Sequence, residues 1–292
     1  MEFIEYVVHD RVGEIVFNRP DKLNAIHAPM LAEFKAAIER ARDDAAVSVV
    51  LLRGNGRAFT VGWDLVEVGA RGLTHTQISD HRRLIDSTTL MLDIWDFPKP
   101  IVSAVHGFCL AAGAFIASMT DVIVASDNLE VGWAKVPLGA GWMTQIFTHL
   151  IGASHTMELS SVRGSVMTGE QALQWGWATH AYPADEVLEQ ARELAGKMAR
   201  TPVDLLVLNK RAARKATDRL GFRDAITGGI EYNNLAHFTP GAEAVRAKLR
   251  ELGVGGVIEW FEAGGTLRDD FPGNSAPSEA SGANNVTAEA SS

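Results

Sequence analysis

Residues 54–64, GNGRAFTVGWD, and residues 105–121, VHGFCLAAGAFIASMTD, are the two stretches that decide the fold of this sequence. Each follows an apolar, strand-like run and opens into helix-like sequence. At such turns backbone N–H groups lack partners, so an anionic oxygen can accept hydrogen bonds from them. Two such turns that face each other would form an oxyanion hole. Because residues 114–116 are Ala-Phe-Ile, no acid follows the second turn directly, and the sequence indicates a site for an enolate without a neighbouring acid or base.

The composition is that of a large globular protein. The 292 residues are 47% apolar and 22% charged, with a net charge of −9, so one domain, with or without a helical appendage, can bury a full core. The basic residues 210–215 are predicted to lie on the polar face of a helix, so no nucleic-acid partner is expected. The single Cys109 excludes an intrachain disulfide and fits a reducing compartment. The sequence lacks an apolar signal core and a membrane-spanning run, so we expect a cytoplasmic protein with no membrane partner.

Strands and helices are predicted to alternate in the first half of the chain. Wholly apolar runs predict buried strands, and three- and four-residue apolar spacing predicts helices. The alternation favours right-handed βαβ crossovers and a largely parallel α/β core. The expected strands are residues 3–8, 14–18, 48–53, 101–105 and 121–125, and the expected helices are a segment from Pro29 and residues 77–95.

The second half of the chain is predicted to be mainly helical, over residues 154–162, 168–176, 184–200 and 202–219. We expect a core of residues 1–200 and a helical region of residues 201–271. Residues 272–292 are rich in Pro, Gly, Ser and Ala and have almost no apolar anchor, so they are expected to form a disordered tail. Residues 69–76 are expected to form a mobile loop.

Four motifs in order carry a family resemblance. They are NRPDKLNAI at residues 18–26, GRAFTVGWDL at 56–65, PKPIVSAVHG at 98–107, which leads into the segment ending at Asp121, and TGEQALQWG at 168–176. With this order and spacing the chain resembles the crotonase, or enoyl-CoA hydratase/isomerase, family over residues 3 to 249. The resemblance implies a ββα spiral core and a helical C-terminal region that trimerises, giving a homotrimer or a dimer of trimers.

The resemblance also implies the ligand and its binding residues. The substrate would be an acyl-CoA, with coenzyme A entering as part of the substrate and with no metal or permanent cofactor. By motif position, the backbone N–H groups of Trp63 and Ala112 would hold the thioester oxygen, and the chemistry would pass through a CoA enolate. Residues expected to bind CoA are Lys22, Leu23, Ala25, Ala58 and Val61, with Lys22 as a phosphate partner. Further residues expected at the substrate site are Asp64, Leu65, Phe115, Trp133 and Gly141.

The sequence departs from the hydratase pattern at both catalytic acids. Hydratases of the family use two glutamates, one as base and one as acid. Phe115 stands at the position of the first. Gly132, Trp133 and Lys135 compete for the position of the second, and none is acidic. The two-glutamate hydration is therefore expected to be absent or very slow, unless a slipped register brings Glu130 near the site.

Several other residues could act as the acid, base or nucleophile in place of the two glutamates. Aryl-acyl-CoA dehalogenases of the family have a Trp that Trp133 could match, but their Asp nucleophile would fall at Gly141, so that reaction has no basis here. Lys135 is a candidate base if burial lowers its pKa. The remaining candidates are Glu67, His75, Asp80, His81, His106 and Cys109. Each of them can also be interpreted as an ordinary surface, turn or packing residue without a role in catalysis.

The aromatic residues suggest a class of acyl group. Trp63, Phe115, Trp133 and Trp142 fall at or near the expected pocket, which is many for a short linear acyl chain. They indicate a bulky, flat or cyclic acyl group, or else fill a core or a trimer contact. The leading hypothesis is a family enzyme, a lyase or isomerase, that stabilises a thioester enolate. The alternative is a non-catalytic acyl-CoA-binding protein.

Overall fold

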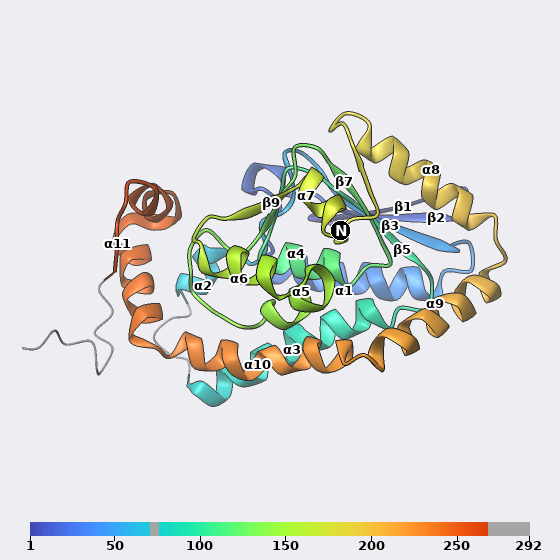
Figure 1. Cartoon of the computed structure of the whole chain (residues 1–292). Helices are drawn as coiled ribbons and strands as arrows, with labels where there is room; N and C mark the ends of the chain where they lie inside the picture. The colour runs from blue at the N-terminus through green and yellow to red at the C-terminus, as the bar shows by residue number, and fades with distance from the viewer. Residues whose placement is uncertain (71–75, 268–292) are drawn as a thin grey trace, which may run out of the picture.

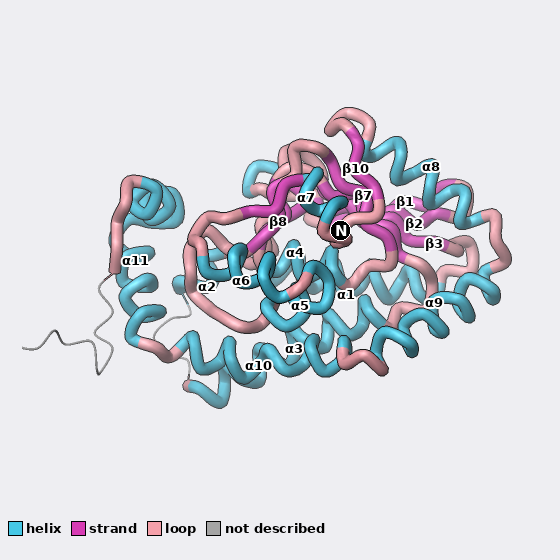
Figure 2. Tube along the Cα trace, viewed as in Figure 1, coloured by secondary structure: helices cyan, strands magenta, loops and turns pink. Residues whose placement is uncertain are grey.

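The computed structural model describes residues 1–70 and 76–267. Its main sheet has six strands in the order β1-β2-β3-β5-β7-β10 (Figure 2). Only β1 and β2 pair in antiparallel fashion, and every other neighbouring pair is parallel. The bounds are β1 Ile4–His9, β2 Val12–Phe17, β3 Val49–Gly54, β5 Ile101–Val105, β7 Val122–Ser126 and β10 His180–Tyr182. The predicted α/β class with a largely parallel core is confirmed.

Helices cover both faces of this sheet, which explains why its central strands β3, β5 and β7 are largely apolar. Helix α8 (Val187–Ala199) covers one face with small residues at four-residue spacing, including Ala191 and Ala195, which pack on β3, β5 and β7. Helix α1 (Ala28–Asp43) packs on the other face through buried side chains such as Phe34. The six-stranded sheet is thus packed between helices on both faces.

A second sheet of four short strands was not predicted from the sequence. Its order is β4-β6-β8-β9, and only β8 and β9 are antiparallel. The strands are β4 Ala58–Thr60, β6 Phe108–Leu110, β8 Glu130–Gly132 and β9 Val166–Thr168. Each has three residues, too few to show a period of two in the sequence.

The remaining helices surround the two sheets. Helices α3 (Gln77–Trp95) and α10 (Phe222–His237) lie side by side along one edge of the molecule (Figure 1). Helix α11 (Pro240–Glu262) follows α10 and changes direction at Gly253, where φ is 69°. The others are η1 Pro20–Lys22, α2 Leu65–Ala70, α4 Ala112–Ser118, α5 Thr144–Ile151, α6 Ala153–Ser161, α7 Gly169–Gln174 and α9 Val203–Asp218.

The boundaries of the predicted elements agree with the structure to within one or two residues for most strands and helices. The expected tail, residues 272–292, and most of the expected loop, 69–76, lie outside the described residues. Within the described part of the chain, none of the helices is both long enough and apolar enough to cross a membrane. The proposed domain boundaries and the cytoplasmic location stay predictions.

Candidate active site

The two glycine-containing turns meet. Strand β4 leads into Gly62 and Trp63, and strand β6 leads into Ala111 and Ala112 at the start of α4. Gly62 has a φ of +86°, and a Cβ added there would lie 2.8 Å from the backbone nitrogen of Ala112. Only a residue without a side chain lets the two turns approach this closely.

The backbone N–H groups of Trp63 and Ala112 are free. Within residues 1–70 and 76–267 neither has a hydrogen-bond acceptor, whereas both neighbouring amides are bonded: Ala111 N–H to the carbonyl of Gly132 at 2.8 Å, and Asp64 N–H to that of Ile26 at 3.0 Å. Ala111 has φ 50° and ψ −121°, a conformation that costs a non-glycine residue of order 1–3 kcal/mol. The two free donors, adjacent in space, form the candidate oxyanion hole.

A cleft of about 1110 Å³ opens beside these donors. Helix α11 supplies part of its wall through residues such as Val254 and Ile258. Of the residues expected from the sequence, those that line the cleft are Lys22, Leu23, Ala25, Val61, Trp63, Asp64, Leu65, Ala112, Trp133, Lys135 and Gly141.

Two of the expected site residues lie elsewhere. Ala58 is fully buried in β4, and Phe115 is fully buried in α4; neither lines the cleft. The indole of Trp142 does line it, and Phe115 packs against that indole. Phe115 therefore supports the cleft wall from behind instead of facing a ligand.

Asp64 is engaged by its neighbours. Its carboxylate lies 2.6 Å from Nη1 of Arg19 and accepts from the N–H of Val66 at 3.0 Å. Burial raises the pKa of Asp64, but the hydrogen bonds from Arg19 and the backbone outweigh that effect and lower it. Arg19 also donates to the carbonyl of Ala25 at 3.0 Å, so this pair ties the residue 19–25 turn to the hole.

Lys135 and Glu130 do not form a buried acid–base pair. Lys135 Nζ lies 4.0 Å from the Glu130 carboxylate and 5.5 Å from the centre of the Phe108 ring, with its side chain 32% exposed. Lys135 lines the cleft, whereas Glu130 does not. Among the described residues, no glutamate lines this cleft.

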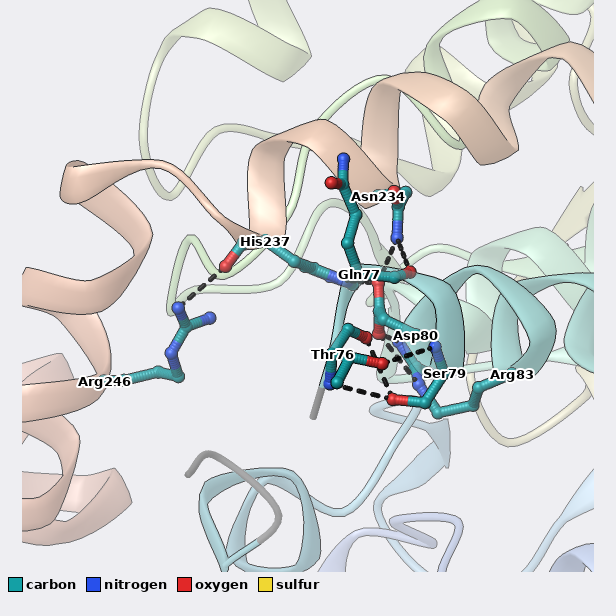
Figure 3. A network of polar contacts seen from close by, with 8 residues as sticks. All are labelled: Thr76, Gln77, Ser79, Asp80, Arg83, Asn234, His237 and Arg246. Atoms are coloured by element: carbon teal, nitrogen blue, oxygen red, sulfur yellow. Dashed lines mark hydrogen bonds and ion pairs between the residues drawn. The ribbon is translucent and has the colours of Figure 1, made fainter. Parts of the chain in front are cut away.

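A polar network occupies another part of the cleft wall (Figure 3). Asp80 on α3 receives hydrogen bonds from His237 Nδ1 at 2.8 Å, Arg83 at 2.8 Å and Asn234 at 3.1 Å. Burial raises the pKa of Asp80, but the bonds from His237 and Arg83 outweigh it and hold that pKa far below its usual range. Asp80 was among the residues considered from the sequence, but His237 was missed, because nothing in a helix 157 positions later marks it as a partner.

Of the other candidates, His75 lies outside the described residues and His81 on α3 does not line the cleft. The rest make contacts within the fold. His106 bonds the carbonyl of Gly56 at 2.9 Å, and burial lowers its pKa. Burial raises the pKa of the Cys109 thiol, so its thiolate is disfavoured. Glu67 accepts from the N–H of Ala28 at 3.2 Å, at the start of α1, and lines a side pocket of about 220 Å³. Trp63 lines both cavities, and its indole N–H is buried without a partner among the described residues.

Comparisons with known proteins agree with this fold. The enoyl-CoA hydratase/isomerase family model matches residues 8–234. A 2,3-dehydroadipyl-CoA hydratase of Escherichia coli (strain K12) is 34% identical over 212 residues, which cover 71% of this chain and 80% of the relative. A carnitinyl-CoA dehydratase of Proteus mirabilis (strain HI4320) is 29% identical over 229 residues, which cover 76% of this chain and 85% of the relative. The crystal structure of an enoyl-CoA hydratase/isomerase from Xanthobacter autotrophicus Py2 matches with a TM-score of 0.84 and 26% identity, covering 91% of this chain and 99% of that one.

The two sheets, the helical C-terminal region and the paired turns define a crotonase-fold enzyme. The chain belongs to the enoyl-CoA hydratase/isomerase family, as the resemblance implied.

Proposed function

We propose that the cleft binds an acyl-CoA thioester and that the N–H groups of Trp63 and Ala112 hold its carbonyl oxygen as an enolate forms. The observation that carries this proposal is the pair of unbonded amides brought together by Gly62. Donors fixed before the reaction cost no reorganisation when charge develops, and one such donor is worth roughly 3–4 kcal/mol. Because backbone atoms do the work, a Trp and an Ala can occupy these positions.

The CoA portion is proposed to lie along the residue 19–25 turn. Lys22 is exposed at the edge of the cleft and suits a phosphate group, and Leu23, Ala25 and Val61 line the same region. Arg57 was not predicted from the sequence as a site residue. It is exposed and lines the cleft, so it offers a second cation for a CoA phosphate. Coenzyme A would enter as part of the substrate, with no permanent cofactor.

The acyl group is proposed to be bulky, flat or cyclic. Trp63, Trp133 and Trp142 all line the cleft, and flat groups stack well on indole rings. Two relatives, a 2,3-dehydroadipyl-CoA hydratase and a carnitinyl-CoA dehydratase, support a CoA ester as the substrate but do not specify its acyl part.

The reaction is proposed to differ from two-glutamate hydration. Phe115 occupies the first glutamate position and cannot carry a proton. Glu130, the remaining acid of the second segment, does not line the described cleft. Isomerisation or another enolate reaction is therefore favoured over syn addition of water.

The oligomer implied by the family is also part of the proposal. Leu205 and Leu208 on α9 and Tyr232 and Leu235 on α10 are exposed apolar side chains, of the kind that a homotrimer or dimer of trimers would bury. Sedimentation of the purified chain would measure its assembly, and a monomer at micromolar concentration would contradict this part.

Binding and hydration assays test the proposed site together. Calorimetry with phenylacetyl-CoA, butyryl-CoA and free CoA should show both thioesters binding more tightly than CoA, and phenylacetyl-CoA most tightly. Hydration of crotonyl-CoA should stay close to the uncatalysed rate. Rapid hydration, or equal affinity for all three ligands, would overturn the proposal.

The second candidate is an acyl-CoA-binding protein without catalysis. The observation that favours it is the absence of any glutamate from the described cleft lining. The two candidates agree on binding and differ on proton exchange at the acyl α-carbon, which only an enolate-forming enzyme accelerates.

A further inference from the structure

The proposed function leaves the proton-transfer group unnamed, and the network on α3 and α10 supplies one. We propose that His237 is the catalytic base and acid of this cleft, and that Asp80 is its positioning residue. The inference rests on the proposed function, because it needs a thioester held at the oxyanion hole.

The contact between the two side chains sets the state of the imidazole. His237 Nδ1 lies 2.8 Å from Oδ2 of Asp80. An ionised carboxylate only accepts hydrogen bonds, so Nδ1 must carry the proton that it donates. In the neutral ring Nε2 then has a lone pair. Within residues 1–70 and 76–267, Nε2 has no hydrogen-bond partner. The ring is therefore prepared to accept a proton at Nε2.

The carboxylate is held in its charged form and in one orientation. Arg83 donates to Oδ1 of Asp80, and Asn234 donates to Oδ2 and also to the carbonyl of Gln77 at 3.0 Å. With its side chain only 7% exposed, Asp80 exchanges little with water. An ionised Asp80 stabilises the imidazolium that forms when Nε2 takes a proton, as carboxylates do for catalytic histidines in general.

The charges around His237 come from three sources. Asp80 and Arg83 face it from α3, and Arg246 on α11 donates to its backbone carbonyl at 2.7 Å. Arg83 is neutralised by Asp80, while Arg246 pairs with Glu243 at 2.9 Å. The two arginines near His237 are thus each paired with a carboxylate, and Asp80 is the acid that contacts the imidazole directly.

His237 and the proposed oxyanion hole share one cleft. His237 is 19% exposed on its side chain and lines the same cleft as Trp63 and Ala112, but it belongs to a different wall. Gly139 from the loop between β8 and α5 packs against the imidazole so closely that a Cβ there would lie 3.0 Å from Nε2. Any side chain at position 139 would crowd Nε2, so glycine is the residue that leaves room beside the imidazole.

The proposed step is a proton transfer that balances without a co-reactant. Nε2 of His237 takes the proton from the acyl α-carbon, so a C–H bond breaks and an N–H bond forms. The C–H electron pair becomes the Cα=C bond, and the carbonyl pair moves to the oxygen held by Trp63 and Ala112. The imidazolium then returns a proton to the α-carbon, or to the γ-carbon of an unsaturated acyl group, which shifts the double bond.

The test measures exchange of the α-protons of phenylacetyl-CoA in deuterated water by NMR. His237→Gln should slow exchange at least ~100-fold, the usual contribution of a general base. Asp80→Asn should slow it less and move the pH–rate profile to lower pH, because the imidazolium loses its carboxylate. His9→Gln, an exposed histidine on β1, is the matched control and should leave the rate unchanged. Added imidazole should partly restore a His237→Ala variant.

Each outcome bears on one proposal. If His237→Gln exchanges protons at the wild-type rate, or if Asp80→Asn leaves the pH profile in place, the dyad is not the base. Loss of phenylacetyl-CoA binding in folded His237→Gln, with no rescue of His237→Ala by imidazole, would assign the pair a structural role and also overturn the inference. Absence of exchange in the wild-type protein would instead overturn the proposed function itself.

Discussion

The ring of Phe115 packs edge-on against the indole of Trp142, with centroids 4.8 Å apart and planes at 87°. Phe115 is fully buried and does not line the cleft. Trp142 donates a hydrogen bond from its indole N–H to Oγ1 of Thr88 at 3.3 Å. Residue 115, which the family resemblance predicts to be the first glutamate position of the hydratases, is thus part of a packed aromatic wall. We therefore expect that a single substitution at this position does not produce hydration.

Introducing the hydratase acid should therefore damage the fold. Phe115→Glu would bury a carboxylate among apolar groups and remove the contact with Trp142, and we expect a loss of unfolding free energy of roughly 3–5 kcal/mol. Phe115→Leu, the matched control, should cost less than about 2 kcal/mol. Urea denaturation measures both. A stable Phe115→Glu protein that hydrates crotonyl-CoA would contradict the assignment of Phe115 to the core.

Gly62 offers a test of the contact between the two turns. Gly62→Ala places a Cβ 2.8 Å from the Ala112 nitrogen at a φ of +86°. Gly152→Ala is a matched control, because Gly152 has a φ of +83° and nothing within 4 Å of the added Cβ. Both variants should lose about 1 kcal/mol or more of stability through backbone strain. Only Gly62→Ala should also lose thioester affinity in calorimetry, and equal affinity in the two variants would show that the turns do not form the site.

A buried lysine predicts an unusual dependence of stability on pH. Lys210 lies 2.6 Å from Asp121, but burial outweighs that ion pair and lowers the pKa of Lys210 from 10.5 to about 8. Since the unfolded chain binds this proton more tightly, the free energy of unfolding should rise as the pH rises from about 8 to about 10.5, by up to roughly 3 kcal/mol. The gain is lost again as the pH falls from about 10.5 to about 8. Urea denaturation across this range measures it.

The control for that prediction is Lys210→Met, which keeps the length of the side chain and removes its charge. Its pH dependence between 8 and 10.5 should be flatter than that of the wild type by the same amount. Parallel curves for the two proteins would show that Lys210 has an ordinary pKa.

The sequence was sufficient to predict the helices and strands that are long enough to show a regular pattern of apolar residues. The strand that became β5 is apolar at four of its five positions, and the helix that became α3 has the predicted bounds, with a capping box of Thr76 and Ser79 at its start. Strands β4, β6, β8, β9 and β10 were missed, since three residues held in place by tertiary pairing have no period of their own.

The candidate site also has parts that local sequence predicts and parts that depend on tertiary packing. The two glycine-containing turns follow from local glycine and small-residue patterns, whereas the choice of the Trp63 and Ala112 amides followed from the motif positions of the family. The pairing of Asp80 with His237 depends on α3 and α10 lying side by side, and a contact between residues 157 positions apart leaves no local signal. The burial of Phe115 behind Trp142 depends likewise on packing that only the folded chain reveals.

The measurement that tests the central claim most directly is α-proton exchange of phenylacetyl-CoA in deuterated water, with wild-type protein, Ala112→Pro and Ala112→Gly. Ala112 is the first residue of α4, where proline fits a helix but removes the N–H, whereas glycine keeps it. The proposal of an enolate held by two backbone donors predicts rapid exchange in the wild type, a loss of about 10²–10³-fold in folded Ala112→Pro, and near wild-type exchange in Ala112→Gly. Equal rates in Ala112→Pro and wild type, or no exchange by the wild type, would contradict it.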